Sequence, residues 1–205
     1  MGFYRHHVFP RLLDLAMASP ALREPRRRTL APARGRVLEL GFGTGRNLPH
    51  YPPSVERIEA IDPDRDLDRL SLPRIRHARI AVDFHHLDAE QLPFAEASFD
   101  TVVSTMTLCT IPDVAHALSE VRRVLRPGGQ FLFLEHGQAP DPRVARLQER
   151  LNPWWMPLAG GCHLNRSIPQ LLKESGLMPA AVNSYYMKRT PRFVGYMTEG
   201  IARKA

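Results

Sequence analysis

Three glycines at alternate positions, Gly41, Gly43 and Gly45, follow a short apolar run and come directly after Glu39 and Leu40. Glycine adopts positive φ without strain and lets a ligand approach the backbone closely. In open parallel sheets, ligands bind beyond the carboxyl ends of the strands. The third glycine comes two residues after the second rather than three, so the loop departs from the GxGxxG pattern of dinucleotide-binding proteins. The spacing therefore predicts a ligand-binding turn of another kind.

A carboxylate, Asp62, lies 21 residues after Gly41, where a second apolar run ends. At the end of a strand beside the glycine loop, a carboxylate can accept hydrogen bonds from both ribose hydroxyls of an adenosine.

The elements that must position these residues begin at Arg36. Strands are predicted over residues 36–40, 57–61, 81–86, 99–104 and 130–134. Residues 113–125 have the apolar periodicity of an amphipathic helix, with Asp113 as its N-cap and the Arg-Pro-Gly-Gly of 126–129 as its end. Strands that alternate with helices predict a parallel α/β sheet with right-handed crossovers and helices on both faces.

The flanking segments are less regular. Residues 3–18 have partial helical spacing, and residues 19–35 are rich in Pro and Arg and predict a connection with room for one helical stretch. A helix near 167–175 and strands near 180–187 and 193–198 are expected after the central region. We therefore expect an N-terminal helical lid or connection over 1–35 and one domain over 36–205.

The composition is that of a globular chain with a real core: 205 residues, 43% hydrophobic and 24% charged. The formal net charge of +7 is carried almost entirely by arginine, which leaves open a solvated basic surface or an anionic partner. The two cysteines have neither metal-ligand spacing nor a disulfide framework, so we expect no metal site and a reducing compartment. No apolar run reaches the length of a membrane span, and a cytoplasmic location is expected.

The glycine loop and Asp62 resemble motif I and the second-strand acidic residue of the class I S-adenosylmethionine (SAM)-dependent methyltransferases. The resemblance continues through residues 87–94 (LDAEQLPF), 98–100 (SFD) and 120–129 (EVRRVLRPGG). It covers roughly residues 36–136. Four motifs in the same order are much more specific than a glycine loop alone.

This resemblance implies a Rossmann-like α/β fold: a mostly parallel seven-stranded sheet with helices on both faces and an N-terminal helical segment. It implies SAM as the cofactor and S-adenosylhomocysteine as its product. The glycine loop would pass around the methionine part, Asp62 would hold the ribose, and Ser104 and Thr105 would line the cavity near the methyl group. The full set of implied cofactor-binding residues is Glu39, Gly41, Gly43, Thr44, Gly45, Asn47, Asp62, Pro63, Asp88, Ala89, Ser104 and Thr105.

A narrower resemblance lies in residues 134–137 (LEHG), 151–155 (LNPWW) and 160–166 (GGCHLNR). This order looks like the membrane-associated alkyl thiol methyltransferases and their bacterial relatives. It implies a small lipophilic acceptor, a thiol being the best single expectation. The animal enzymes carry an N-terminal apolar anchor that this sequence does not show, so peripheral membrane contact stays open.

A thiol needs only modest help to ionise, which a histidine can give. His136 is the first candidate base and His163 the second, with a structural or surface role as the alternative for each. The residues expected near the acceptor are Tyr4, Trp154, Trp155, Cys162 and Arg166. Residues 153–158 (PWWMPL) could cover an apolar substrate, contact a membrane surface or pack in the core.

Other functions are compatible with the same core motifs. A phospholipid amine or a quinone ring carbon could be the acceptor, or the chain could bind SAM without catalysis. A nucleic acid is disfavoured, because residues 104–107 (STMT) lack the Asn/Asp-Pro-Pro-aromatic pattern of many base-amine methyltransferases and no basic stripe interleaved with aromatics is visible. Either a monomer or a homodimer is expected.

Overall fold

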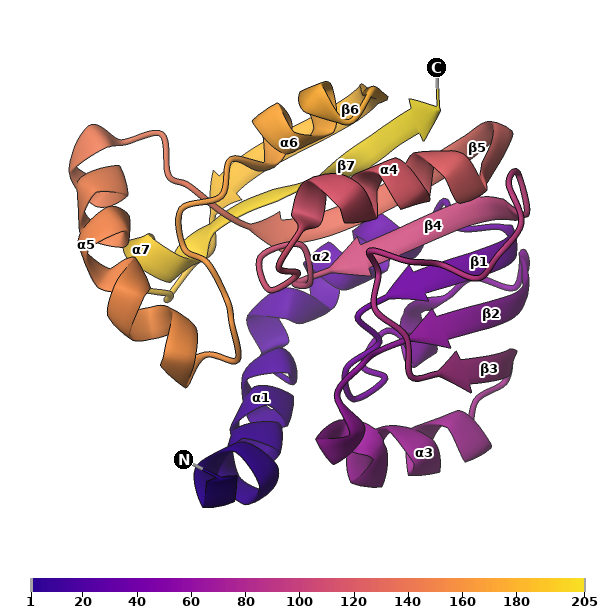
Figure 1. Ribbon diagram of the computed structural model, residues 1–205, viewed down its shortest axis with the longest axis horizontal. Coiled ribbons are helices and arrows are strands. Elements are labelled where there is room, and N and C mark those ends of the chain that lie inside the picture. Colours follow the sequence, from indigo (N-terminus) through magenta and orange to yellow (C-terminus); the bar gives the residue numbers. More distant parts are fainter. Residues whose placement is uncertain (1, 205) are drawn as a thin grey trace.

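Strand β1 (Gly35–Leu40) lies at the middle of the sheet, in parallel between β2 (Val55–Ile61) and β4 (Phe99–Thr105), in a computed structural model that describes residues 2–204. Seven strands pair in the order β3-β2-β1-β4-β5-β7-β6 (Figure 1). The outer strands are β3 (Ala81–His85), β5 (Leu125–His136), β6 (Leu177–Tyr186) and β7 (Tyr196–Lys204), and β7 alone runs antiparallel to both of its neighbours. This is the predicted Rossmann-like sheet, and the fold class is confirmed.

Alternate residues of the central strands face two separate cores, as expected for a sheet covered on both faces. Leu38 and Leu40 point toward α4 (Val114–Val124) and α6 (Ile168–Glu174). Val37 points the other way and packs in a cluster with Leu30, the last residue of α2 (Pro20–Leu30). The predicted apolar face of α4 is buried, and Asp113 caps the helix by accepting a hydrogen bond from the His116 N–H at 3.0 Å.

The N-terminal segment is helical along most of its length. It consists of η1, a π-helix over Tyr4–Val8, then α1 (Phe9–Met17) and α2, which begins with Pro20 and contains Pro25. Figure 1 shows α1 projecting below the sheet, between α5 and α3 (Asp68–Arg76). Two short 3-10 turns, η2 (Leu48–His50) and η3 (Arg65–Leu67), follow β1 and β2.

The region after β5 departs most from expectation. Helix α5 (Pro142–Leu158) runs through the whole PWWMPL segment, although Pro153 and Pro157 each remove a backbone donor. The strand expected over 193–198 is wrong in its first part, because α7 (Arg192–Gly195) occupies those residues and β7 begins at Tyr196. Over residues 2–204, no helix has both the length and the apolar character needed to cross a membrane.

Candidate functional site

The carboxyl ends of β1, β4 and β5 lie together at one edge of the sheet. Leu40 pairs with Ser104, and Thr105 pairs with Leu134, so the three strands end almost level. The glycine loop follows β1, the segment 106–110 follows β4, and His136 ends β5. The structure thus brings the predicted cofactor and acceptor residues of these strands to one edge.

The three glycines of the loop all have positive φ, at 64°, 58° and 77°. A Cβ on Gly41 would lie 2.2 Å from the side chain of Thr107, so packing against the β4 loop excludes any side chain there. A Cβ on Gly43 would meet only the Gly41 carbonyl oxygen, at 3.9 Å. Gly43 therefore borders open space, and this is the point of the loop where a ligand can approach the backbone.

Behind the loop, Glu39 is fully buried and is the centre of a polar cluster. Its carboxylate accepts hydrogen bonds from Asn47 Nδ2 at 2.8 Å and from the Tyr51 hydroxyl at 2.7 Å. Asn47 Nδ2 also donates to Thr105 Oγ1 at 2.9 Å, while Asn47 Oδ1 is buried and has no hydrogen-bond partner within the described part of the chain. Burial raises the pKa of Glu39 to about 7, against the opposing effect of the two donors. The cluster offers an unused acceptor beside a carboxylate, which suits an ammonium group.

Asp62 joins the β2 end to the glycine loop. Its carboxylate accepts the Gly43 N–H at 2.7 Å and the Asp64 N–H at 2.9 Å. Burial raises the pKa of Asp62, against these two backbone donors. Two carboxylate oxygens hold more lone pairs than two donors use, so ribose hydroxyls can still be accepted.

The other predicted cofactor residues are placed unevenly. Pro63 and Asp88 are exposed, whereas Ala89 is buried in the core on the α4 side. The Ser104 hydroxyl donates a hydrogen bond to the Glu135 carboxylate at 2.7 Å. Its proton is therefore already used within the protein and is not free to contact a ligand. The roles of these residues toward a cofactor stay predictions.

Glu135 shapes the segment after β4. Its buried carboxylate accepts the backbone N–H of Thr107 at 2.9 Å and of Leu108 at 3.2 Å. Burial raises the pKa of Glu135 to about 7, against these hydrogen bonds. Just before them, Met106 has a φ of 58°, which is uncommon for a residue with a side chain. The carboxylate thus holds a strained turn at the strand end.

Asp14 on α1 is a site residue that the sequence analysis missed. It accepts hydrogen bonds from Thr44 Oγ1 at 2.5 Å, from Arg46 Nε at 2.9 Å and from Arg74 Nη1 at 2.8 Å. Burial acts to raise the pKa of Asp14, but Arg46, Arg74 and Thr44 together hold it well below its usual range. The only signal in the sequence was a single acidic residue in an apolar and basic segment. Helix α1 is therefore hydrogen-bonded directly to the glycine loop.

The predicted bases have different surroundings. His136 is buried, and its Nε2 lies 2.9 Å from Cys162 Sγ. His163 Nδ1 lies 3.1 Å from the Cys109 carbonyl oxygen, which also accepts the His163 backbone N–H at 2.8 Å. Cys109, on the β4 loop, completes a group in which the sulfur and nitrogen atoms of Cys109, His136 and Cys162 all lie within 4.8 Å of one another. Folding thus brings together two cysteines whose spacing in the sequence showed no relation.

The residues predicted near the acceptor do not form one surface. Trp155 donates its indole N–H to Cys162 Sγ at 3.3 Å, but Trp154 is 77% exposed. The Tyr4 hydroxyl donates to the Leu158 carbonyl at 3.1 Å, which joins η1 to the end of α5. Arg166 donates to the carbonyl oxygens of Leu108 and Pro112 and so supports the β4 loop.

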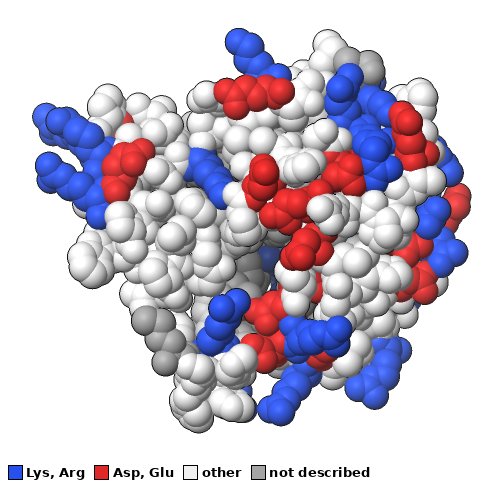
Figure 2. Space-filling view, in the orientation of Figure 1, with Lys and Arg blue, Asp and Glu red and all other residues white. Residues whose placement is uncertain are grey.

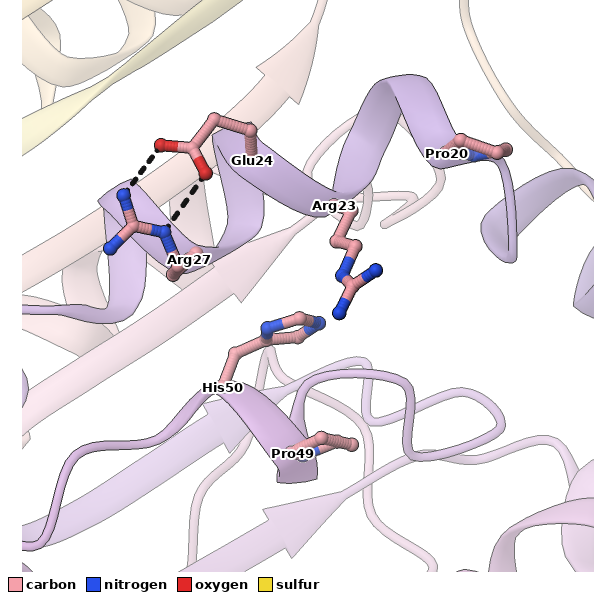
Figure 3. Close-up of a pocket in the computed structure, with 6 residues that line it drawn as sticks. All are labelled: Pro20, Arg23, Glu24, Arg27, Pro49 and His50. Carbon is pink, nitrogen blue, oxygen red and sulfur yellow. Dashed lines mark hydrogen bonds and ion pairs between the residues drawn. The ribbon is translucent and has the colours of Figure 1, made fainter.

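Surface charge and cavities give two further facts. Figure 2 shows acidic side chains grouped at the middle of one face beside a hollow, with basic side chains spread around the rim, so this face has no continuous basic stripe. A separate cavity of about 430 Å³ lies between α2 and η2 (Figure 3). None of the predicted site residues lines it; its walls are Pro20, Arg23, Glu24, Arg27, Pro49 and His50.

Comparison with known proteins bears on this geometry. Residues 38–133 match the family model described as a methyltransferase domain. A thiol S-methyltransferase TMT1B from Rattus norvegicus is 36% identical over 134 residues, which cover 63% of this chain and 54% of the relative. A phosphatidylethanolamine N-methyltransferase from Cereibacter sphaeroides is 33% identical over 132 residues, covering 62% and 64%. The chain thus spans little more than half of the length of the thiol methyltransferase.

Among solved structures, the N-methyltransferase NodS from Bradyrhizobium japonicum, in complex with S-adenosylhomocysteine, has a TM-score of 0.72 and 17% identity, covering 99% of this chain and 95% of that one. At this identity the likeness concerns the fold alone.

Proposed function

Since this chain belongs to the class I SAM-dependent methyltransferases, we propose that it transfers a methyl group from SAM to a small lipophilic thiol. The observation that carries the methyl transfer is the open turn at Gly43, bordered by Glu39, Asn47 and Asp62 at the strand ends. The similarity to a thiol S-methyltransferase over 63% of the chain supports the choice of acceptor.

The residues present fit the cofactor. Asn47 Oδ1, which has no partner among residues 2–204, and the Glu39 carboxylate suit the ammonium of the methionine part, and Asp62 has free lone pairs for the ribose. When bound, SAM supplies a sulfonium methyl that is already activated for displacement. What remains for the chain is to align the acceptor, exclude water and accept a proton.

His136 can accept that proton. It is buried at the end of β5, and its Nδ1 has no hydrogen-bond partner among residues 2–204. A thiol has an ordinary pKa near 8.5, so a neighbouring imidazole is sufficient help near neutral pH. The Trp155 ring, which packs edge-on against Phe193 with centroids 6.0 Å apart, adds apolar surface near Cys162. This environment favours a lipophilic acceptor.

The test is turnover with purified protein and SAM across alkyl thiols, aryl thiols, phenols, quinols and vesicles that contain phosphatidylethanolamine. Mass spectrometry would quantify S-adenosylhomocysteine and each methylated product. We expect thioethers. Methylated amine, phenol or quinol without thioether would replace the thiol by that acceptor, and SAM binding without any product would indicate a non-catalytic SAM-binding protein.

A further inference from the structure

Two thiols and an imidazole from three distant segments converge in the interior. Cys109 lies on the loop after β4, His136 ends β5, and Cys162 precedes α6. Their exposed fractions are 2%, 4% and 9%, and their ligand atoms lie within 4.8 Å of one another. Buried polar groups need partners. Here His136 Nε2 contacts Cys162 Sγ, which also accepts the Trp155 indole N–H, and the Cys109 thiol donates to the Met106 carbonyl oxygen at 3.7 Å.

The set has the chemistry of a zinc site. Zinc is bound by cysteine sulfur at about 2.3 Å and by histidine nitrogen at about 2.0–2.1 Å in a tetrahedron, which places ligand atoms about 3.6–3.8 Å apart. The 2.9 Å between His136 Nε2 and Cys162 Sγ would lengthen by roughly 0.7 Å to reach that spacing. Two thiolates also balance the charge of one divalent ion, so the zinc-filled site would be neutral before the acceptor binds, which is compatible with burial.

We propose that Cys109, His136 and Cys162 bind one zinc ion whose fourth coordination position takes the sulfur of the acceptor thiol. Sites with three protein ligands keep such a position for water or substrate. The acceptor half of this proposal rests on the proposed thiol methylation, whereas the metal half rests on the three side chains alone.

The surroundings suit a metal-bound thiolate. The Trp155 indole N–H points at Cys162 Sγ from 3.3 Å, and a donor of this kind stabilises negative charge on sulfur. Among residues 2–204, His136 Nδ1 has no hydrogen-bond partner, so the ring can carry its proton there and present the Nε2 lone pair to a metal. The group also lies at the sheet edge where the glycine loop follows β1, since β5, β4 and β1 are successive neighbours.

The reaction balances without a redox change. With zinc bound, His136 would serve as a ligand and no longer as the base. The acceptor thiol would replace a water at the fourth position and release its proton to solvent, because coordination deprotonates a thiol. A sulfur lone pair of the acceptor forms the bond to the methyl carbon. The carbon–sulfonium bond breaks, and its electron pair stays on the cofactor sulfur. The products are a thioether and S-adenosylhomocysteine.

The metal half can be tested without turnover. Protein purified with a reductant and without chelator would be analysed for zinc, and the metal-free form would be titrated with Co²⁺, which absorbs intensely when bound by thiolates in a tetrahedral site. We expect one ion per chain. Cys109→Ser, Cys162→Ser and His136→Gln should each lose more affinity than the roughly 10–100-fold that removal of an outer-shell partner costs. Trp155→Phe should fall within that range.

The control is His116→Ala, which removes an exposed histidine on α4 and should leave cobalt binding unchanged. Circular dichroism would show that each variant folds. The metal site is overturned if the reduced, folded protein with two free thiols binds no cobalt, or if the cysteine variants bind it like the original chain.

The acceptor half needs a second readout. An alkyl thiol added to the cobalt form should shift its absorption, and chelation should abolish thioether formation until zinc is restored. An unchanged cobalt spectrum, or full thiol methylation by metal-free protein, would overturn the acceptor half while the proposed function stands. A spectral shift with no thioether from the zinc-loaded protein would sink the proposed function and support the site.

Discussion

Asp14 and Arg46 form a two-point ion pair, with Arg46 Nε 2.9 Å from Oδ1 and Arg46 Nη2 2.5 Å from Oδ2 of the carboxylate. Arg74 binds the same carboxylate from α3 and also donates to the Thr44 carbonyl at 2.6 Å. One side chain therefore joins the N-terminal helix, the glycine loop and α3, so the position of α1 and the shape of the cofactor loop depend on each other.

Replacing Asp14 by Ala should loosen α1 from the loop and weaken SAM binding. Hydrogen bonds to charged groups contribute about 1.5–3 kcal/mol each when removed, and this carboxylate is mostly buried while both arginines are about one-third exposed, so we expect the lower end of that range. Faster proteolysis within residues 2–18 would show that α1 is loosened, and a larger SAM dissociation constant by calorimetry would show that SAM binding is weakened. Glu24→Ala, which breaks only an exposed pair with Arg27, should change neither; equal effects of the two variants would refute a role for Asp14.

Gly41→Ala should mainly lower the stability of the protein, whereas Gly43→Ala should mainly weaken SAM binding. A Cβ on Gly41 collides with Thr107, so we expect overpacking to lower the free energy of unfolding by roughly 1–3 kcal/mol, in addition to the strain of its positive φ. Gly43→Ala meets open space and carries only the strain of its positive φ, about 1–2 kcal/mol. It should nevertheless lose more SAM affinity than its stability loss explains. Urea unfolding and SAM calorimetry on both variants decide this, and intact SAM affinity in Gly43→Ala would contradict the placement of the ligand.

Asp62→Asn should weaken SAM binding by about 10–100-fold. The amide replaces one acceptor oxygen by a donor that faces the Gly43 or Asp64 N–H, and charged hydrogen bonds are the stronger kind. Asp88→Asn is the matched comparison, because Asp88 is an exposed carboxylate on the loop after β3. A larger loss of affinity in Asp88→Asn than in Asp62→Asn would reverse the assigned importance of the two residues.

Glu39 should make the protein less stable as pH rises from about 5 to 8. The pKa of its carboxyl is raised from 4.5 to about 7 by burial, so between these values the folded chain keeps a proton that the unfolded chain has lost. The contribution is complete below pH 4.5 and lost as pH passes 7, up to about 3 kcal/mol. Urea unfolding at pH 5 and pH 8 should show a smaller difference for Glu39→Gln. The exposed Glu56→Gln should keep the original difference, and a Glu39→Gln protein with that same difference would show that Glu39 is already ionised.

Elements whose signal lies within a short stretch of the chain could be predicted from the sequence. Strand β1, the glycine loop and α4 each carry their signal within a dozen residues, as an apolar run, alternate glycines or a capped amphipathic period. Asp62 was identifiable because its place follows from the end of a predicted strand.

What depends on contacts between distant segments could not be read in this way. Asp14 acquires its role only when α1 meets Arg74, and Cys109 meets Cys162 only after β4, β5 and α5 are in place. Helix α5 continues through two prolines that would ordinarily predict its end, with Asp141 capping its start by accepting the Arg143 N–H at 2.9 Å. Its buried Gln148 donates to the Gly137 and Phe193 carbonyls, contacts that no local pattern announces.

Strand β7 is the last strand along the chain but lies inside the sheet, between β5 and β6. During synthesis β5 therefore keeps an unpaired edge, and β6 has no partner, until residues 196–204 have left the ribosome. The half of the sheet that carries the methyltransferase motifs can pair earlier, since β1 to β5 are neighbours without β7. Folding should thus proceed in two stages. A side chain at Gly200 would place a Cβ 2.2 Å from the Ala181 carbonyl oxygen and so hinder the pairing of β7. Such a substitution should prolong an intermediate in which the edge of β5 is unpaired and prone to aggregation.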